Sequence, residues 1–233
     1  YLDNASTHFP KPTEVADSVY QFMTACGCNI NRGGYDSAYD AGMMVFETRQ
    51  MLCDLFDGPD VRNVIFTKNV TESLNIVLKG FLRPGDHILV SAMEHNAVMR
   101  PLIQLTGQST QTVKSHEQFP KDQSRRSCVP VSNIDSRLSD DKTFRHSISC
   151  NGISFDRIPC DEQGRLILSA VEGMIRPGTK AICMTHASNV CGTLMPIKEV
   201  GEICHSKGIR FIVDAAQTAG VWNISMKEMH IDA

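Results

Sequence analysis

The sequence comprises 233 residues, of which 42% are hydrophobic and 21% are charged, with a formal net charge of -3. This composition is typical of a globular chain long enough to bury a core. The weak negative charge gives no reason to expect nucleic acid or an anionic membrane surface as a partner. No stretch approaches the roughly 18 consecutive apolar residues that a membrane span requires.

Nine cysteines are scattered along the chain without a CxxC pair, and Cys26-Gly27-Cys28 is too tight for the usual zinc spacing. Several lie in apolar runs, such as Cys183 and Cys204, where a cysteine acts as a small hydrophobic residue. We therefore expect reduced thiols and no metal site, rather than a disulfide or metal framework. Together with the lack of a visible signal peptide, this favours a cytoplasmic location.

The first half of the chain predicts helices followed by alternating strands and helices. Amphipathic patterns predict helices over Pro12 to Cys26 and over Ser37 to Phe56, the second ending before Gly58-Pro59. A short apolar run over Asn63 to Thr67 predicts a buried strand. The further predicted elements of this half are a helix over Thr71 to Leu82, a strand over His87 to Ser91 and a helix over Asn96 to Leu105.

The second half repeats the alternation of strand and helix. Its predicted strands cover Ile153 to Ile158, Lys180 to Thr185 and Ile209 to Asp214, and its predicted helices cover Leu168 to Ile175 and Ile197 to Lys207. Continuous Val and Ile runs joined by helical crossovers indicate a mostly parallel sheet with helices on both faces. The predicted fold class is α/β.

The stretch from Gly107 to Asn151 breaks the pattern. It is rich in Ser, Gln, Lys, Arg and Asp and shows no sustained period. We expect a flexible surface insertion within one domain that spans residues 1–233. A binding role for this basic, Ser-rich segment is the alternative.

Polar residues follow several predicted strands. Asp214 ends a buried strand, Thr71 begins a helix after one, and His95 and Asn189 each follow another. Ligands in open α/β sheets lie beyond the carboxyl ends of strands, so a carboxylate, an anion-binding helix start, a ring and an amide are expected on one rim. A buried carboxylate needs a partner, and a protonated pyridine nitrogen is one. The structural alternatives are helix caps for Asp214 and Thr71 and a hydrogen-bonded structural role for His95.

Five short motifs stand out along the chain, and four of them contain these polar residues. They are Tyr1-Leu2-Asp3-Asn4-Ala5-Ser6-Thr7, Asn69-Val70-Thr71-Glu72-Ser73-Leu74-Asn75, Glu94-His95-Asn96-Ala97, Ser188-Asn189-Val190-Cys191-Gly192-Thr193 and Val213-Asp214-Ala215-Ala216-Gln217. They cover nearly the whole chain apart from Gly107 to Asn151. In the same order, they resemble motifs of the class V aminotransferases, with the greatest likeness to the cysteine desulfurase and selenocysteine lyase branch.

The resemblance implies the large domain of a pyridoxal 5′-phosphate (PLP) enzyme, truncated at its C-terminal side. By this resemblance Asp214 pairs with the pyridine N–H, and His95 stacks on the ring and moves protons. Gln217 and Asn189 then bind the phenolate oxygen of the ring.

The resemblance also implies that Val70 and Thr71 hold the cofactor phosphate. The sequence departs from the family here: Val70 stands where Ala is usual, which a backbone contact tolerates, and Asn69 stands where Gly is common. The second change alters the local turn.

The implied activity is the conversion of L-cysteine to L-alanine with sulfur held as an enzyme persulfide, in a homodimer that passes sulfur to an acceptor protein. The chain ends before the family's Schiff-base lysine and sulfur-accepting cysteine, so we expect it to be inactive alone. Cys191 occupies a position that the family does not use as the nucleophile. The alternatives are another class V enzyme, such as a selenocysteine lyase or aminotransferase, and a non-catalytic remnant. Four lysines are not expected to substitute for the missing one: Lys180, Lys198, Lys207 and Lys227.

Overall fold

The computed structural model describes residues 7–30, 33–107 and 152–233. The predicted insertion from Gly107 to Asn151 therefore lies outside the described residues except for Gly107 itself, and so does the opening motif before Thr7.

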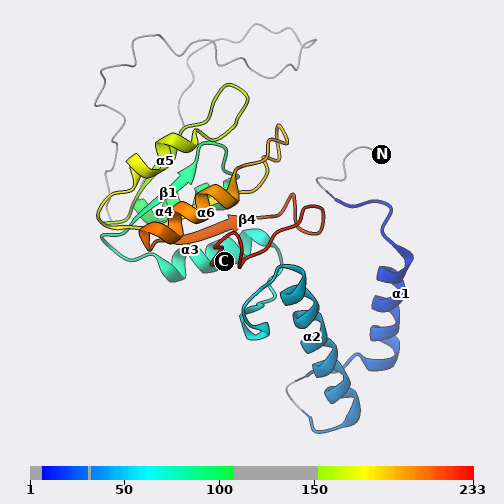
Figure 1. Cartoon of the computed structure of the whole chain (residues 1–233). Helices are drawn as coiled ribbons and strands as arrows, with labels where there is room; N and C mark the ends of the chain where they lie inside the picture. The colour runs from blue at the N-terminus through cyan, green and yellow to red at the C-terminus, as the bar shows by residue number, and fades with distance from the viewer. Residues whose placement is uncertain (1–6, 31–32, 108–151) are drawn as a thin grey trace, which may run out of the picture.

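Two helices at the N-terminal side project away from the sheet (Figure 1). The first, α1 (Thr13–Gln21), continues into a π-helix (Phe22–Cys26), and the second is α2 (Asp36–Leu55). Both confirm the predicted helices, but α1 buries none of its residues and α2 buries only three. Large apolar side chains exposed on these helices include Val15, Val19, Tyr20, Met23, Tyr39, Met43, Met44, Phe46, Met51 and Leu55.

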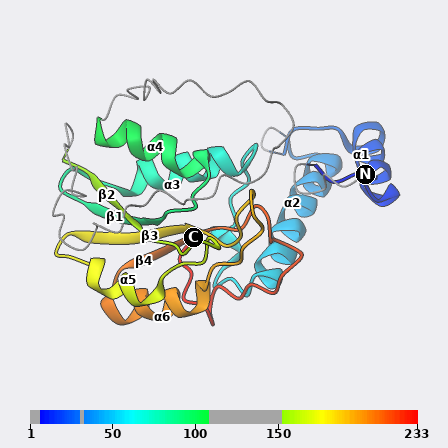
Figure 2. The same cartoon turned by 90° about the horizontal axis from the view of Figure 1, so that it is seen from above.

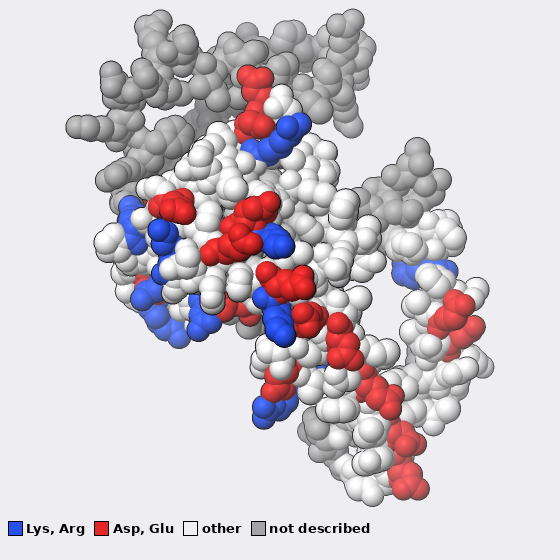
Figure 3. Space-filling view, in the orientation of Figure 1, with Lys and Arg blue, Asp and Glu red and all other residues white. Residues whose placement is uncertain are grey.

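One side of α2 carries an acidic stripe, visible as a red column in Figure 3. Its carboxylates recur every four or seven residues, the spacing that places side chains on one face of a helix. They are Asp36, Asp40, Glu47 and Asp54. The helix is therefore acidic along one side, and several of its large apolar side chains are not covered by the described residues.

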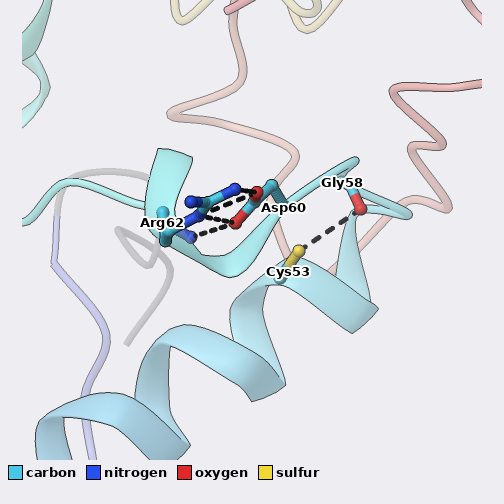
Figure 4. A network of polar contacts seen from close by, with 4 residues as sticks. All are labelled: Cys53, Gly58, Asp60 and Arg62. Carbon is cyan, nitrogen blue, oxygen red and sulfur yellow. Dashed lines mark hydrogen bonds and ion pairs between the residues drawn. The ribbon is translucent and has the colours of Figure 1, made fainter.

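The predicted strand over Asn63 to Thr67 is wrong. The chain forms a short 3₁₀-helix (Val61–Asn63) and then irregular backbone, and Ile65 and Phe66 are 66% and 48% exposed. The turn is fixed by Asp60, whose carboxylate accepts hydrogen bonds from the backbone and the guanidinium of Arg62 (Figure 4). The Arg62 side chain lowers the pKa of Asp60 to about 2. A local ion pair and a capped turn thus replace the predicted pairing into the sheet.

Four parallel strands form the sheet in the order β2-β1-β3-β4. This confirms the predicted α/β class. Among the described residues after 69, the helices and strands match their predicted bounds to within one residue at each end. They are α3 (Val70–Phe81), β1 (His87–Ser91), α4 (Asn96–Thr106), β2 (Ser154–Ile158), α5 (Leu168–Met174), β3 (Thr179–Thr185), α6 (Ile197–Lys207) and β4 (Arg210–Asp214).

The sheet separates two apolar layers. Helices α3 and α4 cover one face, and α5 and α6 cover the other (Figure 2). Alternate residues of each strand serve the two layers, so that Val90 and Cys183 pack beneath α3 and α4, whereas Leu89 and Ile182 pack beneath α5 and α6. All four are fully buried. The sheet is thus covered on both sides, which fixes the positions of its strand ends.

The residues after β4 return to pack on the sheet. Asp232 N–H donates to the Phe211 carbonyl at 2.8 Å, and Val213 N–H donates to the Ala233 carbonyl at 2.8 Å. On the way the chain passes α6 so closely that a Cβ at Gly201 would lie 1.8 Å from the Met229 carbonyl oxygen. Only glycine fits at this crossing.

Candidate functional site

The carboxyl ends of the strands meet at one edge of the sheet. The register pairs Val90 with Cys183 and Thr185 with Asp214, so β1, β3 and β4 end side by side. Helix α3 leads into the start of β1 and therefore runs antiparallel to it. Its 12 residues span about 18 Å, close to the length of the strand, which brings its N-terminus to the same edge.

Asp214 is the last residue of β4 and is only 4% exposed. Its Oδ1 accepts a hydrogen bond from the Ala216 N–H at 3.0 Å. The backbone carbonyl of Asp214 accepts a hydrogen bond from the backbone N–H of His186. The Nδ1 atom of the His186 ring is hydrogen-bonded to the Thr218 hydroxyl at 2.9 Å. Burial lowers the pKa of His186, so this ring is neutral at pH 7. The carboxylate of Asp214 is thus held in place by its own turn, with no cation supplied by these contacts.

Glu94 joins the ends of two strands. Its Oε1 accepts hydrogen bonds from the Ser91 hydroxyl and from the Thr185 N–H, the latter at 2.9 Å. Its Oε2 is buried and has no hydrogen-bond partner in the described residues. Burial, together with the nearby charge of Asp214, raises the pKa of Glu94 to about 7. Glu94 lies in the same sequence motif as His95, but the motif predicted no role for its carboxyl group.

His95 is exposed and is the N-cap residue of α4. Its Nδ1 accepts the Ala97 N–H at 3.1 Å, which places the proton of a neutral ring on Nε2. The structural role considered for this histidine is therefore present. It leaves the ring at the edge where Asp214 emerges.

The N-terminus of α3 is a capped helix start. Asn69 is the N-cap, and its side chain accepts the Glu72 N–H at 3.0 Å, while the Glu72 carboxylate accepts the Lys68 N–H at 2.8 Å. The N–H groups of Val70 and Thr71 belong to the first turn, where a helix supplies no acceptor of its own. Asn69 thus stabilises the turn in place of the usual glycine, and the helix still offers amide groups to an anion.

The loop after β3 carries two exposed polar residues, Asn189 and Cys191. The loop is closed by the Ser188 N–H, which donates to the Thr193 carbonyl at 3.0 Å. Hydrogen bonds from Ser188 and Thr193 lower the pKa of Cys191. Gln217 is half-buried in the turn that follows β4.

One further feature of the described residues lies away from this edge. A cavity of about 480 Å³ lies between α3 and β4 and is lined by Arg210, the first residue of β4, so it sits toward the opposite end of the strand. The four lysines considered from the sequence are all exposed: Lys180, Lys198, Lys207 and Lys227.

In the part of the chain that the structure describes, no cluster of three or more His, Cys, Asp or Glu side chains is arranged to hold a metal ion. No helix in this part is long and apolar enough to cross a membrane.

The sequence matches the aminotransferase class V family over residues 1–140 and 144–233. The chain belongs to the class V aminotransferase family. It is therefore a member of a family of PLP-dependent enzymes, which confirms the resemblance found from its motifs.

Three relatives narrow the likeness to the cysteine desulfurases. The chain is 28% identical over its whole length to a probable cysteine desulfurase of Mycolicibacterium paratuberculosis, of which it spans 28%. It is 27% identical to the cysteine desulfurase IscS of Shewanella denitrificans and spans 48% of that protein. The apo structure of a cysteine desulfurase from Thermococcus onnurineus superposes with a TM-score of 0.76 at 26% identity, over 100% of this chain and 48% of that one. This confirms the large-domain fold, and the chain spans half or less of these relatives' length.

Proposed function

We propose that this chain is the cofactor-binding front part of a PLP-dependent cysteine desulfurase-like enzyme. The observation that carries the proposal is the buried carboxylate of Asp214 at the carboxyl edge of the sheet, in a chain whose relatives are named cysteine desulfurases. A charge in such a place requires a positive partner. The pyridinium nitrogen of PLP is that partner in the proposal.

The donor set at the edge fits the cofactor. A buried carboxylate suits its cationic ring, the amide groups of Val70 and Thr71 suit its phosphate, and the ring of His95 suits its aromatic face. Asn189 and Gln217 supply amide groups for its phenolate oxygen. When bound, PLP supplies an electron sink for the bonds at the substrate Cα.

In this proposal the residues of this chain orient the cofactor ring and stabilise its charge. Asp214 keeps the ring nitrogen protonated, because its negative charge favours the cationic form. His95 holds the ring face, and its Nε2 is free of the capping bond that occupies Nδ1, so that Nε2 is the atom at which it exchanges a proton. The lysine and cysteine that complete the chemistry are proposed to follow this chain in the whole enzyme.

We further propose that the whole enzyme is a homodimer in the cytoplasm. The large apolar side chains exposed on α1 and α2 among the described residues support a partner surface, because exposed apolar side chains that gather on one face mark interaction sites. Seven of the cysteines lie in the described residues and are free thiols, which suits a reducing compartment. An acceptor protein for the sulfur is proposed with the activity.

The complete protein, supplied with PLP, tests this function. We expect it to release alanine from L-cysteine and to carry the sulfur as a persulfide that a thiol reductant removes. Alanine from selenocysteine but not from cysteine would favour the selenocysteine lyase alternative. A complete protein that binds PLP but transaminates instead would overturn the desulfurase assignment while leaving the family intact.

A further inference from the structure

Two carboxyl groups flank the end of β3 at the proposed cofactor edge: Asp214 is buried, and Glu94 is half-buried with a fully buried Oε2 atom. Glu94 comes from the loop between β1 and α4, and Asp214 comes from the end of β4. The Oε1 atom of Glu94 is satisfied by Ser91 and by the Thr185 N–H, but its buried Oε2 atom has no partner among the described residues. Buried carboxylate oxygens are normally hydrogen-bonded, so an ionised Glu94 would be poorly stabilised here.

The groups that face Glu94 do not favour its charge. Asp214 on β4 acts on it as a like charge, and Cys183 on β3 and Cys160 after β2 would do the same if ionised. Burial raises the pKa of both thiols, so they stay neutral. No Lys or Arg forms an ion pair with Glu94 in the described ranges. The hydrogen bonds from Ser91 and Thr185 offset only part of the cost of its burial.

We propose that Glu94 is a positioning residue that holds a proton beside Asp214, so that this edge presents one negative charge rather than two to the cationic ring. The inference rests on the proposed function for the identity of that ring. A single carboxylate balances one pyridinium without leaving excess charge in a buried site. The protonated Glu94 also keeps its bond to the Thr185 N–H, which holds the ends of β1 and β3 together.

The pH dependence of unfolding of the chain without cofactor tests the inference. The folded state keeps the Glu94 proton up to a pKa of about 7, against 4.5 for the ordinary group. The contribution of this group to stability is therefore complete below pH 4.5 and is lost as the pH rises through 7. Between pH 5 and pH 8 the folding equilibrium constant should lose roughly 100-fold through this group alone.

Urea unfolding of the wild type, Glu94→Gln and Asp214→Asn provides the readout. The free energy of unfolding is plotted against pH for each protein. The difference between the wild-type and Glu94→Gln plots separates the stability lost through Glu94 from the contribution of the buried histidines. Glu202→Gln, at an exposed carboxyl on α6, is the matched control and should follow the wild type. Asp214→Asn should move this loss of stability to lower pH, because removal of the like charge lowers the pKa of Glu94. A merely structural Glu94 would not respond to Asp214 in this way.

A Glu94→Gln protein with the same pH dependence as the wild type overturns the inference. If Asp214→Asn does not fold, the infrared carbonyl band of a protonated carboxyl group decides: it should be present in the wild type at pH 6 and weaker in Glu94→Gln, and an unchanged band contradicts the inference. Because no cofactor is used, this failure is distinct from a failure of the proposed function, which would appear as a complete protein that does not bind PLP.

Discussion

The thiols of this chain differ in reactivity because their surroundings differ. Cys183 is fully buried, and burial raises its pKa well above the usual value, while burial raises the pKa of Cys204 to about 12. Cys191 is exposed and lies within hydrogen-bond distance of the Thr193 hydroxyl at 3.3 Å. The thiolate is the reactive form, so Cys191 is the thiol that the fold leaves reactive among these three.

We predict that Cys191 reacts with iodoacetamide at pH 7.5 at least about 10-fold faster than Cys183 or Cys204 in the folded chain. Peptide mass mapping after timed quenching measures the three rates in one sample. In urea the rates should converge, which controls for differences among the peptides. Equal rates in the folded chain would show that the loop does not activate this thiol.

The role of Glu94 marks the limit of prediction at the scale of single residues. Sequence motifs singled out Asp214, His95 and Asn189 as candidates because each lies at or just beyond the end of a predicted strand. The environment of Glu94 depends on Thr185 and Asp214, which are about 90 and 120 residues away in the chain. The signal available was an acidic residue just beyond a buried strand with no Lys or Arg in its motif.

At the scale of elements, boundaries with strong local signals were predictable. Helix α6 starts after Pro196 and ends at Gly208, which adopts the left-handed conformation with φ of 67°, and its predicted bounds are confirmed. The short apolar run around Ile65 had no such signals. An apolar triplet does not specify whether a neighbouring strand is available to pair with it.

The crossing of α6 with the segment before the C-terminus gives a prediction at this scale. Gly201→Ala should destabilise the chain by about 1–3 kcal/mol, because its Cβ would collide with the Met229 carbonyl. Gly173→Ala in α5 is the matched control, since nothing lies within 4 Å of its Cβ. It should be neutral or stabilising by up to about 1 kcal/mol. Urea unfolding compares the two, and a neutral Gly201→Ala would mean that the crossing is looser than described.

At the scale of the whole molecule, the sheet domain buries its core while α1 and α2 do not (Figure 1). The amphipathic patterns predicted these two helices but not where their apolar faces would pack. That information belongs to residues outside the helices themselves. A second copy of the chain is the partner proposed for them.

We predict that the complete protein sediments as a dimer and that Phe46→Glu on α2 shifts it toward the monomer, because a charge would be buried in the interface. Glu47→Gln, at the neighbouring exposed position, should leave the dimer intact. Analytical ultracentrifugation at several concentrations measures both. A monomeric wild type would contradict the predicted dimer, and a Phe46→Glu variant that remains dimeric would place the interface elsewhere.

The central claim is that Asp214 balances the positive ring of PLP at the carboxyl edge of the sheet. The most direct measurement is the absorbance titration of the complete protein with PLP, for the wild type, Asp214→Asn and the exposed control Glu202→Gln. We predict that Asp214→Asn shifts the cofactor band and weakens binding by at least about 10-fold, which corresponds to about 1.4 kcal/mol, whereas the control matches the wild type. An Asp214→Asn protein with unchanged band and affinity would contradict the account.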